Sequence, residues 1–294
     1  MKKVISFCLW AQPNGEQEGR RSMTSYILGA LLNADIAKKE WPDWICRYYI
    51  DESTIPFPII DELKSRDNVE VILYSSNEGY FSTIWRFLSF SDSDVDYVIC
   101  RDIDSRLCLR DKAAVDEWVE SGMYFHIMRD HCQHTEPIGA GMFGIRGNVI
   151  NNISNIIDEY RELAIKKGIY NWFGVDQEFL KYIIYPMTKE KSLVHDEWTT
   201  NQPIFAGEDR KPFPIPREKG DGWWKKSLPK WHSATFGQKT CRDSECKLGC
   251  PDSWCIKTPC PCCKAIHDND YIGIIAEIKN EELEKYSHLL GVKL

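Results

Sequence analysis

The sequence predicts a protein of the α/β class, with a mainly parallel sheet and helices on both of its faces. Three observations lead to this prediction. Over residues 1–130, short apolar runs alternate with segments of helical periodicity. These runs are apolar along almost their whole length, as strands covered on both faces are. Alternation of strand and helix is itself typical of parallel sheets, in which a helix connects one strand to the next.

The elements of this first part follow in order. Val4–Trp10 is an apolar run before a polar stretch, which favours a buried first strand over a signal peptide. Ser22–Lys39 has a serine suited to the N-cap and apolar residues at helical spacing, so it predicts a helix. Trp44–Ile50 is rich in aromatic and branched residues and predicts a strand. The remaining elements expected here are a helix over Pro56–Arg66, a strand over Val69–Tyr74, a helix over Phe81–Phe90, a strand over Tyr97–Cys100, a helix over Asp111–Glu120 and a strand over Tyr124–Met128.

After residue 136 the pattern changes. The expected elements are a Gly-rich strand over Ile138–Arg146, helices over Asn148–Lys167 and Gly174–Ile184, and a last helix over Glu277–Leu290. Residues 204–229 are rich in Pro, Gly and Trp and are expected to cross the surface without regular structure.

Composition excludes several classes of protein. The 294 residues are 43% hydrophobic and 28% charged, which fits an enzyme-sized globular protein and excludes a collagenous or disordered chain. The net charge of −7 argues against nucleic acid as a partner. No run approaches the ~18 apolar residues of a membrane span, so we expect a cytoplasmic protein without one.

Two carboxylates follow a strand in the most informative segment. The strand Tyr97–Cys100 is followed by Arg101 and then by Asp102-Ile103-Asp104. Residues two apart in extended chain point to the same side, so both aspartates can aim at one point beyond the strand. Two carboxylates in one place repel each other unless a cation lies between them. A divalent metal with oxygen ligands suits this position and can stabilise a departing diphosphate. A solvated acidic turn is the alternative.

This segment resembles the glycosyltransferases of the GT-A fold, a Rossmann-like mixed sheet that carries an Asp-x-Asp motif at this point. The order of elements is similar to that of the retaining family that includes bacterial galactosyltransferases and glycogenin. The string Arg101–Arg106 also resembles an uncharacterised glycosyltransferase-like group. The resemblance covers about residues 1–235. The further matches are Arg86 in an upstream helix, Asp130, Gly141 within Ile138–Gly144, and Asp176-Gln177.

The resemblance implies a role for each matched residue. Asp102 and Asp104 would hold Mn²⁺, or Mg²⁺ instead, with Asp102 also contacting the donor ribose. Arg86, Asp130 and Gly141 would bind the donor, a UDP- or GDP-sugar. Asp176 and Gln177 would contact the reacting face of the sugar, and transfer to a glycan, protein or lipid-linked acceptor would retain the anomeric configuration. A third metal ligand is expected, for which His195 is favoured over His232.

Several of these residues also have purely structural explanations. Trp10, after the first strand, can lie against the nucleotide base or in the core. Arg86 can form an exposed ion pair. Asp176 can simply be favoured by the dipole at a helix start. Asp130 can be a turn former.

Seven of the 12 cysteines lie in one window near the C-terminus. With His267 they make eight ligands, enough for two zinc sites, although no pair of close cysteine knuckles is present. Disulfides, which would need an oxidising environment, and free thiols are the alternatives. The window comprises Cys241, Cys246, Cys250, Cys255, Cys260, Cys262 and Cys263. Scattered cysteines elsewhere are expected to be buried thiols.

The sequence therefore predicts a glycosyltransferase domain over residues 1–235 and a Cys-rich extension over 236–294. Two other functions remain open. In a phosphatase of the haloacid dehalogenase type, Asp102 would be the nucleophile and Asp104 the acid/base. Alternatively, a transferase scaffold without catalytic activity would serve as a binding protein, with the Cys-rich extension as its interaction module.

Overall fold

The structure is a computed structural model of the chain. It describes residues 1–11, 23–76, 78–130, 136–188, 190–196, 210–215 and 278–290. The Cys-rich window, His232, His267 and most of the expected extension lie outside these ranges.

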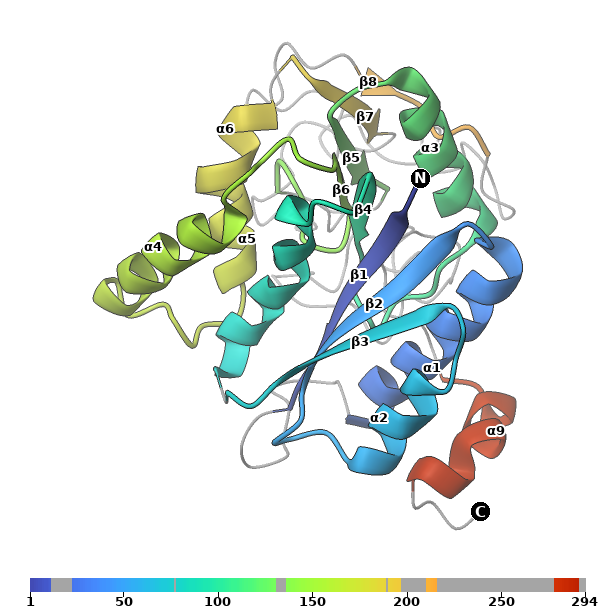
Figure 1. The fold of residues 1–294 in the computed structure, drawn as a ribbon. Coiled ribbons are helices and arrows are strands. Elements are labelled where there is room, and N and C mark those ends of the chain that lie inside the picture. The colour runs from blue at the N-terminus through green and yellow to red at the C-terminus, as the bar shows by residue number, and fades with distance from the viewer. Residues whose placement is uncertain are drawn as a thin grey trace, which may run out of the picture.

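One twisted sheet forms the centre of the described chain (Figure 1). Its strand order is β3-β2-β1-β4-β6-β5-β7-β8. All pairs are parallel except those of β6, which runs antiparallel to β4 and to β5. The prediction of a mixed, mainly parallel sheet is confirmed. The strands are β1 (Lys3–Leu9), β2 (Trp44–Asp51), β3 (Val69–Tyr74), β4 (Tyr97–Cys100), β5 (Phe125–Arg129), β6 (Phe143–Arg146), β7 (Ser192–Asp196) and β8 (Arg210–Lys211).

Helices cover both faces of this sheet, as the apolar strands predict. Ile5, Phe7 and Leu9 of β1 pack with α1 and α2, whereas Val4 and Cys8, on the opposite face, pack with η1, α4 and α5. The helices are α1 (Met23–Glu40), α2 (Phe57–Lys64), the 3₁₀ helix η1 (Gly79–Ser91), α3 (Leu109–Ser121), α4 (Ile153–Lys166), α5 (Val175–Phe179), the π-helical turn η2 (Leu180–Ile184), α6 (Tyr185–Thr188) and α9 (Asn280–Leu290).

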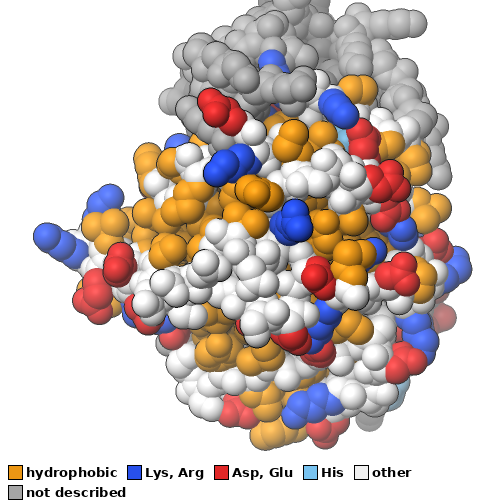
Figure 2. Space-filling model, turned by 45° about the horizontal axis from the view of Figure 1, so that its top comes forward, with side chains coloured by type: hydrophobic (Ala, Val, Ile, Leu, Met, Phe, Trp, Pro, Cys, Tyr) orange, Lys and Arg blue, Asp and Glu red, His pale blue; other side chains and the backbone are white. Residues whose placement is uncertain are grey.

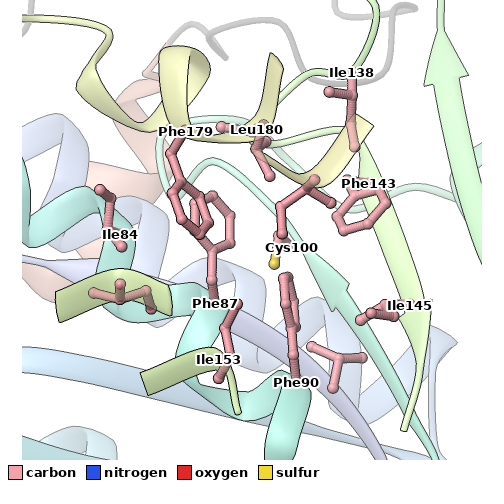
Figure 3. Packing of buried hydrophobic residues seen from close by; sticks show 14 of the residues in the cluster. Ile84, Phe87, Phe90, Cys100, Ile138, Phe143, Ile145, Ile153, Phe179 and Leu180 are labelled. Atoms are coloured by element: carbon pink, nitrogen blue, oxygen red, sulfur yellow. The ribbon is translucent and has the colours of Figure 1, made fainter. Parts of the chain in front are cut away.

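An aromatic core joins η1 to the sheet and to α5 (Figure 3). The ring of Phe87 stacks on Phe179 with centroids 5.7 Å apart, and Phe90 meets Phe143 edge to face at 5.8 Å. All four side chains are fully buried. Because such cores are closely packed, the core fixes η1 and α5 against β4 and β6. It thereby fixes the relative positions of Arg86 and Asp176, which these two elements carry.

The predicted Gly-rich strand Ile138–Arg146 is wrong in length. Only Phe143–Arg146 forms a strand, β6, and residues 138–142 form a turn closed by the Met142 N–H donating to the Gly139 carbonyl (2.9 Å). Since β6 is antiparallel to β4, its first residue pairs with the last residue of β4, as Phe143 does with Cys100. The turn therefore lies at the edge of the sheet where β4 ends.

The last described helix returns to the body of the protein. Tyr286 of α9 is buried in the core cluster beside α1, and Lys285 Nζ donates to Asp35 of α1 at 2.6 Å. None of the helices in the described ranges has both the length and the apolar composition needed to cross a bilayer. On the face seen in Figure 2, hydrophobic side chains gather mainly in the left half, and Lys and Arg lie among Asp and Glu.

Candidate active site

The two aspartates of the motif lie just beyond the carboxyl end of β4, as the sequence predicts. This strand lies between β1 and β6, so the turn that follows it is at the middle of the sheet edge. Asp104 is 3% exposed, whereas the side chain of Asp102 is 40% exposed. A solvated acidic turn would expose both carboxylates, and Asp104 is buried.

An asparagine on α1 holds this turn in place. Asn33 is 1% exposed, and its side-chain amide donates to the carbonyls of Ile103 (3.2 Å) and Ser105 (2.9 Å). Its oxygen accepts from the Leu107 N–H at 3.1 Å. The residues on both sides of Asp104 are thus tied to one rigid helix. This role could not be predicted from the sequence, because an asparagine within a helix has no distinctive spacing.

Arg86 of η1 joins the motif to the start of α5. Its Nη1 donates to Asp102 Oδ1 at 2.7 Å, and its Nη2 donates to Asp176 Oδ2 at 2.6 Å. The same guanidinium also donates to the carbonyls of Thr83 (3.0 Å) and Arg101 (3.3 Å). The Arg86 side chain is only 5% exposed, so the alternative of an exposed ion pair is wrong. One buried cation therefore fixes two carboxylates from distant parts of the sequence.

Asp176 and Gln177 lie in the first turn of α5 and face different partners. Asp176 Oδ2 binds Arg86, and its Oδ1 accepts from the Gln177 N–H at 2.9 Å. With the amide of Gln177 oriented to satisfy both of its groups, the nitrogen donates to the Ile138 carbonyl at 3.2 Å. In this orientation its oxygen accepts from the Ala140 N–H at 2.9 Å. Gln177 thereby holds the turn before β6, which explains why that strand starts later than predicted.

Gly141 is the point at which this turn touches the motif. A Cβ built on Gly141 would lie 2.3 Å from Asp102 Oδ2, 2.5 Å from Cγ and 2.9 Å from the Asp102 nitrogen. No larger residue fits against that carboxylate without movement. Gly141 is thus a point where the backbone closely approaches the Asp102 carboxylate.

The donor set of the motif is suited to a hard divalent cation. Asp102 and Asp104 offer carboxylate oxygens, which Mg²⁺ and Mn²⁺ prefer, and these ions commonly take their remaining ligands from water and substrate phosphates. In the part of the chain that the structure describes, no three His, Cys, Asp or Glu side chains form a metal-binding group. A metal held here would therefore rely on these two carboxylates and on non-protein ligands, or on residues outside the described ranges.

The structure does not bring His195 to these aspartates. His195 is fully buried at the end of β7, where its Nδ1 lies 2.8 Å from His126 Nε2 and its Nε2 lies 3.2 Å from Glu117 Oε2. The expected role of His195 as the third metal ligand is thus replaced by a link between β7, β5 and α3. The rival, His232, lies outside the described residues.

The hydrogen bonds of this histidine pair fix its tautomers. A proton on His195 Nε2 is donated to Glu117, which leaves His195 Nδ1 to accept from His126 Nε2–H. His126 Nδ1 is buried and has no hydrogen-bond partner within the described residues. Burial lowers the pKa of His126 well below its usual range, and burial lowers the pKa of His195 too. A proton on His195 Nδ1 would remove the acceptor of the His126 hydrogen bond, and a proton on His126 Nδ1 would place a positive charge on a buried ring.

Acid is therefore expected to destabilise the protein through this pair. The unfolded chain binds protons on both histidines as the pH falls below about 6.5, whereas the folded chain does not, so stability falls with pH below that value. The expected loss is up to about 1.4 kcal/mol per pH unit for each histidine that stays neutral. Urea unfolding at several pH values measures the slope. His126→Phe should flatten it, and His288→Gln, at an exposed histidine of α9, should not. An equal slope in wild type and His126→Phe would contradict this account.

Two expected donor-binding residues are engaged elsewhere. Asp130 follows β5 and is fully buried in an ion pair with Arg110 of α3. Trp10 is 8% exposed, belongs to the core cluster and meets Tyr80 edge to face at 5.4 Å. Of the alternatives for Trp10, the structure favours the core. Residues 131–135 lie outside the described ranges, so a turn at Asp130 stays a prediction.

The scattered cysteines that the structure describes are free thiols, as expected. Burial raises the pKa of Cys8 to about 11 and that of Cys100 to about 12. A thiol with such a pKa remains protonated at neutral pH and is a poor nucleophile. The reactive groups of the site beside these cysteines are thus its carboxylates and a guanidinium, and not the thiols.

Comparison with known proteins gives structural likeness alone. No protein-family profile matches the chain, and no curated protein matches it. Among solved structures, galactosyltransferase LgtC with donor and acceptor sugar analogues is 16% identical, covering 69% of this chain and 76% of its own, with a TM-score of 0.41. An active-site mutant of LgtC is also 16% identical, with an alignment that covers 71% of this chain and 79% of the mutant's chain and a TM-score of 0.40. A 4-diphosphocytidyl-2C-methyl-D-erythritol synthase from Anaerococcus prevotii is 14% identical. The alignment covers 66% of this chain and 86% of the synthase, with a TM-score of 0.35.

The expected likeness to a galactosyltransferase is thus found among the similar structures. A structural similarity at this level does not assign roles to individual residues. The functional argument rests on the contacts among Arg86, Asp102, Gly141 and Asp176 described above.

Proposed function

We propose that this chain is a metal-dependent glycosyltransferase that moves a hexosyl group from a UDP- or GDP-sugar to an acceptor hydroxyl, with retention. The observation that supports it best is the guanidinium of Arg86 between Asp102 and Asp176. Three segments that the sequence matched to one family meet there, at the carboxyl edge of a mainly parallel sheet. Ligands bind at this edge in open α/β sheets.

The motif is suited to hold the diphosphate end of the donor. Asp102 and Asp104 are the residues that would bind Mn²⁺ or Mg²⁺, which neutralises the charge that grows on a departing diphosphate. Arg86 fixes one Asp102 oxygen, and the other oxygen faces the backbone at Gly141. The rotamer of this carboxylate is therefore set before the donor arrives, which lowers the cost of ordering it.

The burial and the hydrogen bonds of Asp176 support the proposal of retaining stereochemistry. An inverting enzyme needs a carboxylate free to take the proton of the acceptor hydroxyl. Asp176 is buried, with one oxygen on the Arg86 guanidinium and the other on a backbone N–H. Both oxygens of this carboxylate are thus already engaged, and it is placed to orient groups around the sugar. Gln177, which holds the 138–140 turn, positions the neighbouring backbone.

A screen of UDP- and GDP-sugars with Mn²⁺, following release of the nucleoside diphosphate, tests the proposal. We expect release from one donor and its loss when EDTA removes the metal. Hydrolysis of p-nitrophenyl phosphate instead would indicate the phosphatase. Saccharide or nucleotide binding without any release would indicate the non-catalytic binding protein. The anomeric configuration of the product, determined by NMR, tests retention, which an inverted product would contradict.

Gly141→Ala is expected to lower this activity about tenfold to a hundredfold. The new methyl group cannot occupy its ideal position 2.3 Å from Asp102 Oδ2, so the carboxylate or the turn must shift. Overpacking of this kind costs about 1–3 kcal/mol where the contact is buried, and small shifts at a reacting centre are costly in rate. The rate of nucleoside diphosphate release measures the effect.

Gly139→Ala is the matched control for this change. The same turn contains Gly139, but a Cβ there would lie 3.2 Å from Met142 Cβ, a tight contact that a shift of a few tenths of an ångström relieves, and it would not touch Asp102. It should retain most of the activity. Equal activity of the two alanine variants would show that contact with Asp102 is unimportant.

A further inference from the structure

We infer that Trp172 and Phe173 form a binding site for the acceptor, taking a saccharide on their exposed rings. This inference rests on the proposed function and deepens it. The two residues lie in the connection between α4 and α5, beside the start of η1 (Figure 1). They come just before Gly174, at the N-cap of α5, and Asp176 lies in the first turn of that helix.

The pair differs from the aromatic residues around it in exposure. Trp172 is 50% exposed and Phe173 is 59% exposed, whereas Tyr80 and Phe81, which begin η1, are buried. Large exposed rings are costly in water and are typical of binding surfaces. Since the protein buries the nearby rings of η1, Trp172 and Phe173 form the exposed aromatic surface beside this helix start.

The connection is held rigidly, which a preformed site needs. Asn171 Oδ1 accepts from the Tyr80 N–H at 2.8 Å, and the Val175 N–H donates to the Trp172 carbonyl at 3.1 Å. Gly174 has φ +102°, a conformation that other residues rarely adopt. A Cβ there would lie 3.4 Å from Trp172 Cζ3, so one side of the indole rests against the Gly174 backbone.

Phe173 is supported from a different side. Its ring meets Tyr80 edge to face with centroids 5.7 Å apart, and Tyr80 in turn meets the buried Trp10 at 5.4 Å. The Phe173 ring is thereby fixed on the core, and the Trp172 indole lies beside the Gly174 backbone. Preformed rings lose little conformational entropy when a ligand stacks on them.

A saccharide is the ligand that this placement favours. The acceptor hydroxyl must approach the donor sugar near Asp176, and the pair lies just before the same helix, with Phe173 three and Trp172 four residues ahead of this carboxylate. Sugar rings present a face of C–H groups that packs on aromatic rings, while their hydroxyls remain in water. A nucleotide base would stack equally well, and the experiment separates these ligands.

The test measures saccharide binding directly, without donor. Saturation-transfer NMR with lactose, maltose, cellobiose and chitobiose serves as the probe set. We expect at least one disaccharide to bind the wild type and to bind Trp172→Ala about tenfold more weakly. Trp172→Phe, which keeps a stacking ring, should recover most of the affinity. Phe57→Ala, at a 64%-exposed ring on α2, is the control for loss of any exposed ring.

Three outcomes would overturn the inference. These are no binding of any probe to the wild type, equal binding by Trp172→Ala, and an equal fall in the affinity of that variant for UDP or GDP with Mn²⁺. The last would place the rings at the nucleotide or indicate unfolding. Failure of the proposed function has a different signature, since it appears as no release of nucleoside diphosphate by the wild type.

Discussion

Replacing Arg86 by methionine is expected to reduce the rate of sugar transfer about a thousandfold and to destabilise the protein by about 3 kcal/mol. Arg86 is buried, and its guanidinium holds Asp102 at 2.7 Å and Asp176 at 2.6 Å. Methionine fills much of the same volume but leaves the 9%-exposed Asp176 side chain as a buried, unpaired carboxylate. Asp102 is 40% exposed, so water can solvate it and its loss of partner adds little to the stability cost.

Arg86→Lys separates charge from geometry in this experiment. A single ammonium cannot hold both carboxylates as the two guanidinium nitrogens do, so kcat should fall even though the charge remains. Arg161→Met, at a partly exposed arginine of α4 that pairs with Glu78, is the matched control and should leave kcat unchanged. Urea unfolding and nucleoside diphosphate release are the two measurements. If Arg86→Met were stable and active, the proposed site would be wrong.

The body of the fold could be predicted because its strands are apolar on both faces. Residues such as Val4, Ile5 and Phe7 alternate between two helical layers, and both layers are hydrophobic, so the run itself marks the strand. The Gly-rich segment was the exception. The Gln177 amide takes the Ala140 N–H and the Ile138 carbonyl, groups that a longer β6 would need for pairing. That competition between a side chain and a strand has no signature at residues 138–146 themselves.

The candidate site was predictable only where residue type and placement along the chain agree. Asp102 and Asp104 follow a strand, so local pattern locates them, whereas Arg86 and Asp176 were identified only through the family resemblance. His195 also ends a strand, but its partner His126 lies on the neighbouring strand β5. Strand order is not visible in local pattern, so the sequence could not show that this imidazole was already engaged. Asn33, which ties the motif to α1, was missed because an asparagine within a helix has no distinctive spacing.

Asp104→Asn is expected to reduce turnover about a thousandfold and to raise the Mn²⁺ concentration needed for half-maximal rate. Asparagine keeps the size of the side chain and removes its charge. Asn33 binds the backbone on both sides of residue 104, so the turn should keep its conformation in the variant. Loss of activity would then come from the loss of a charged metal ligand and not from a displaced loop.

The free energy of unfolding distinguishes the loss of a metal ligand from a displacement of the loop. Asp102 and Asp104 repel each other in the absence of metal, so Asp104→Asn should keep most of the free energy of unfolding in EDTA. Added Mn²⁺ should stabilise the wild type and have much less effect on the variant. Asp94→Asn, at an exposed aspartate paired with Lys2, controls for nonspecific effects of charge. Equal stabilisation by Mn²⁺ with and without the Asp104 carboxylate would place the metal elsewhere. A fall in stability matching the fall in turnover would make Asp104 a structural residue, and the chemistry would then have to come from Asp102 and Asp176 alone.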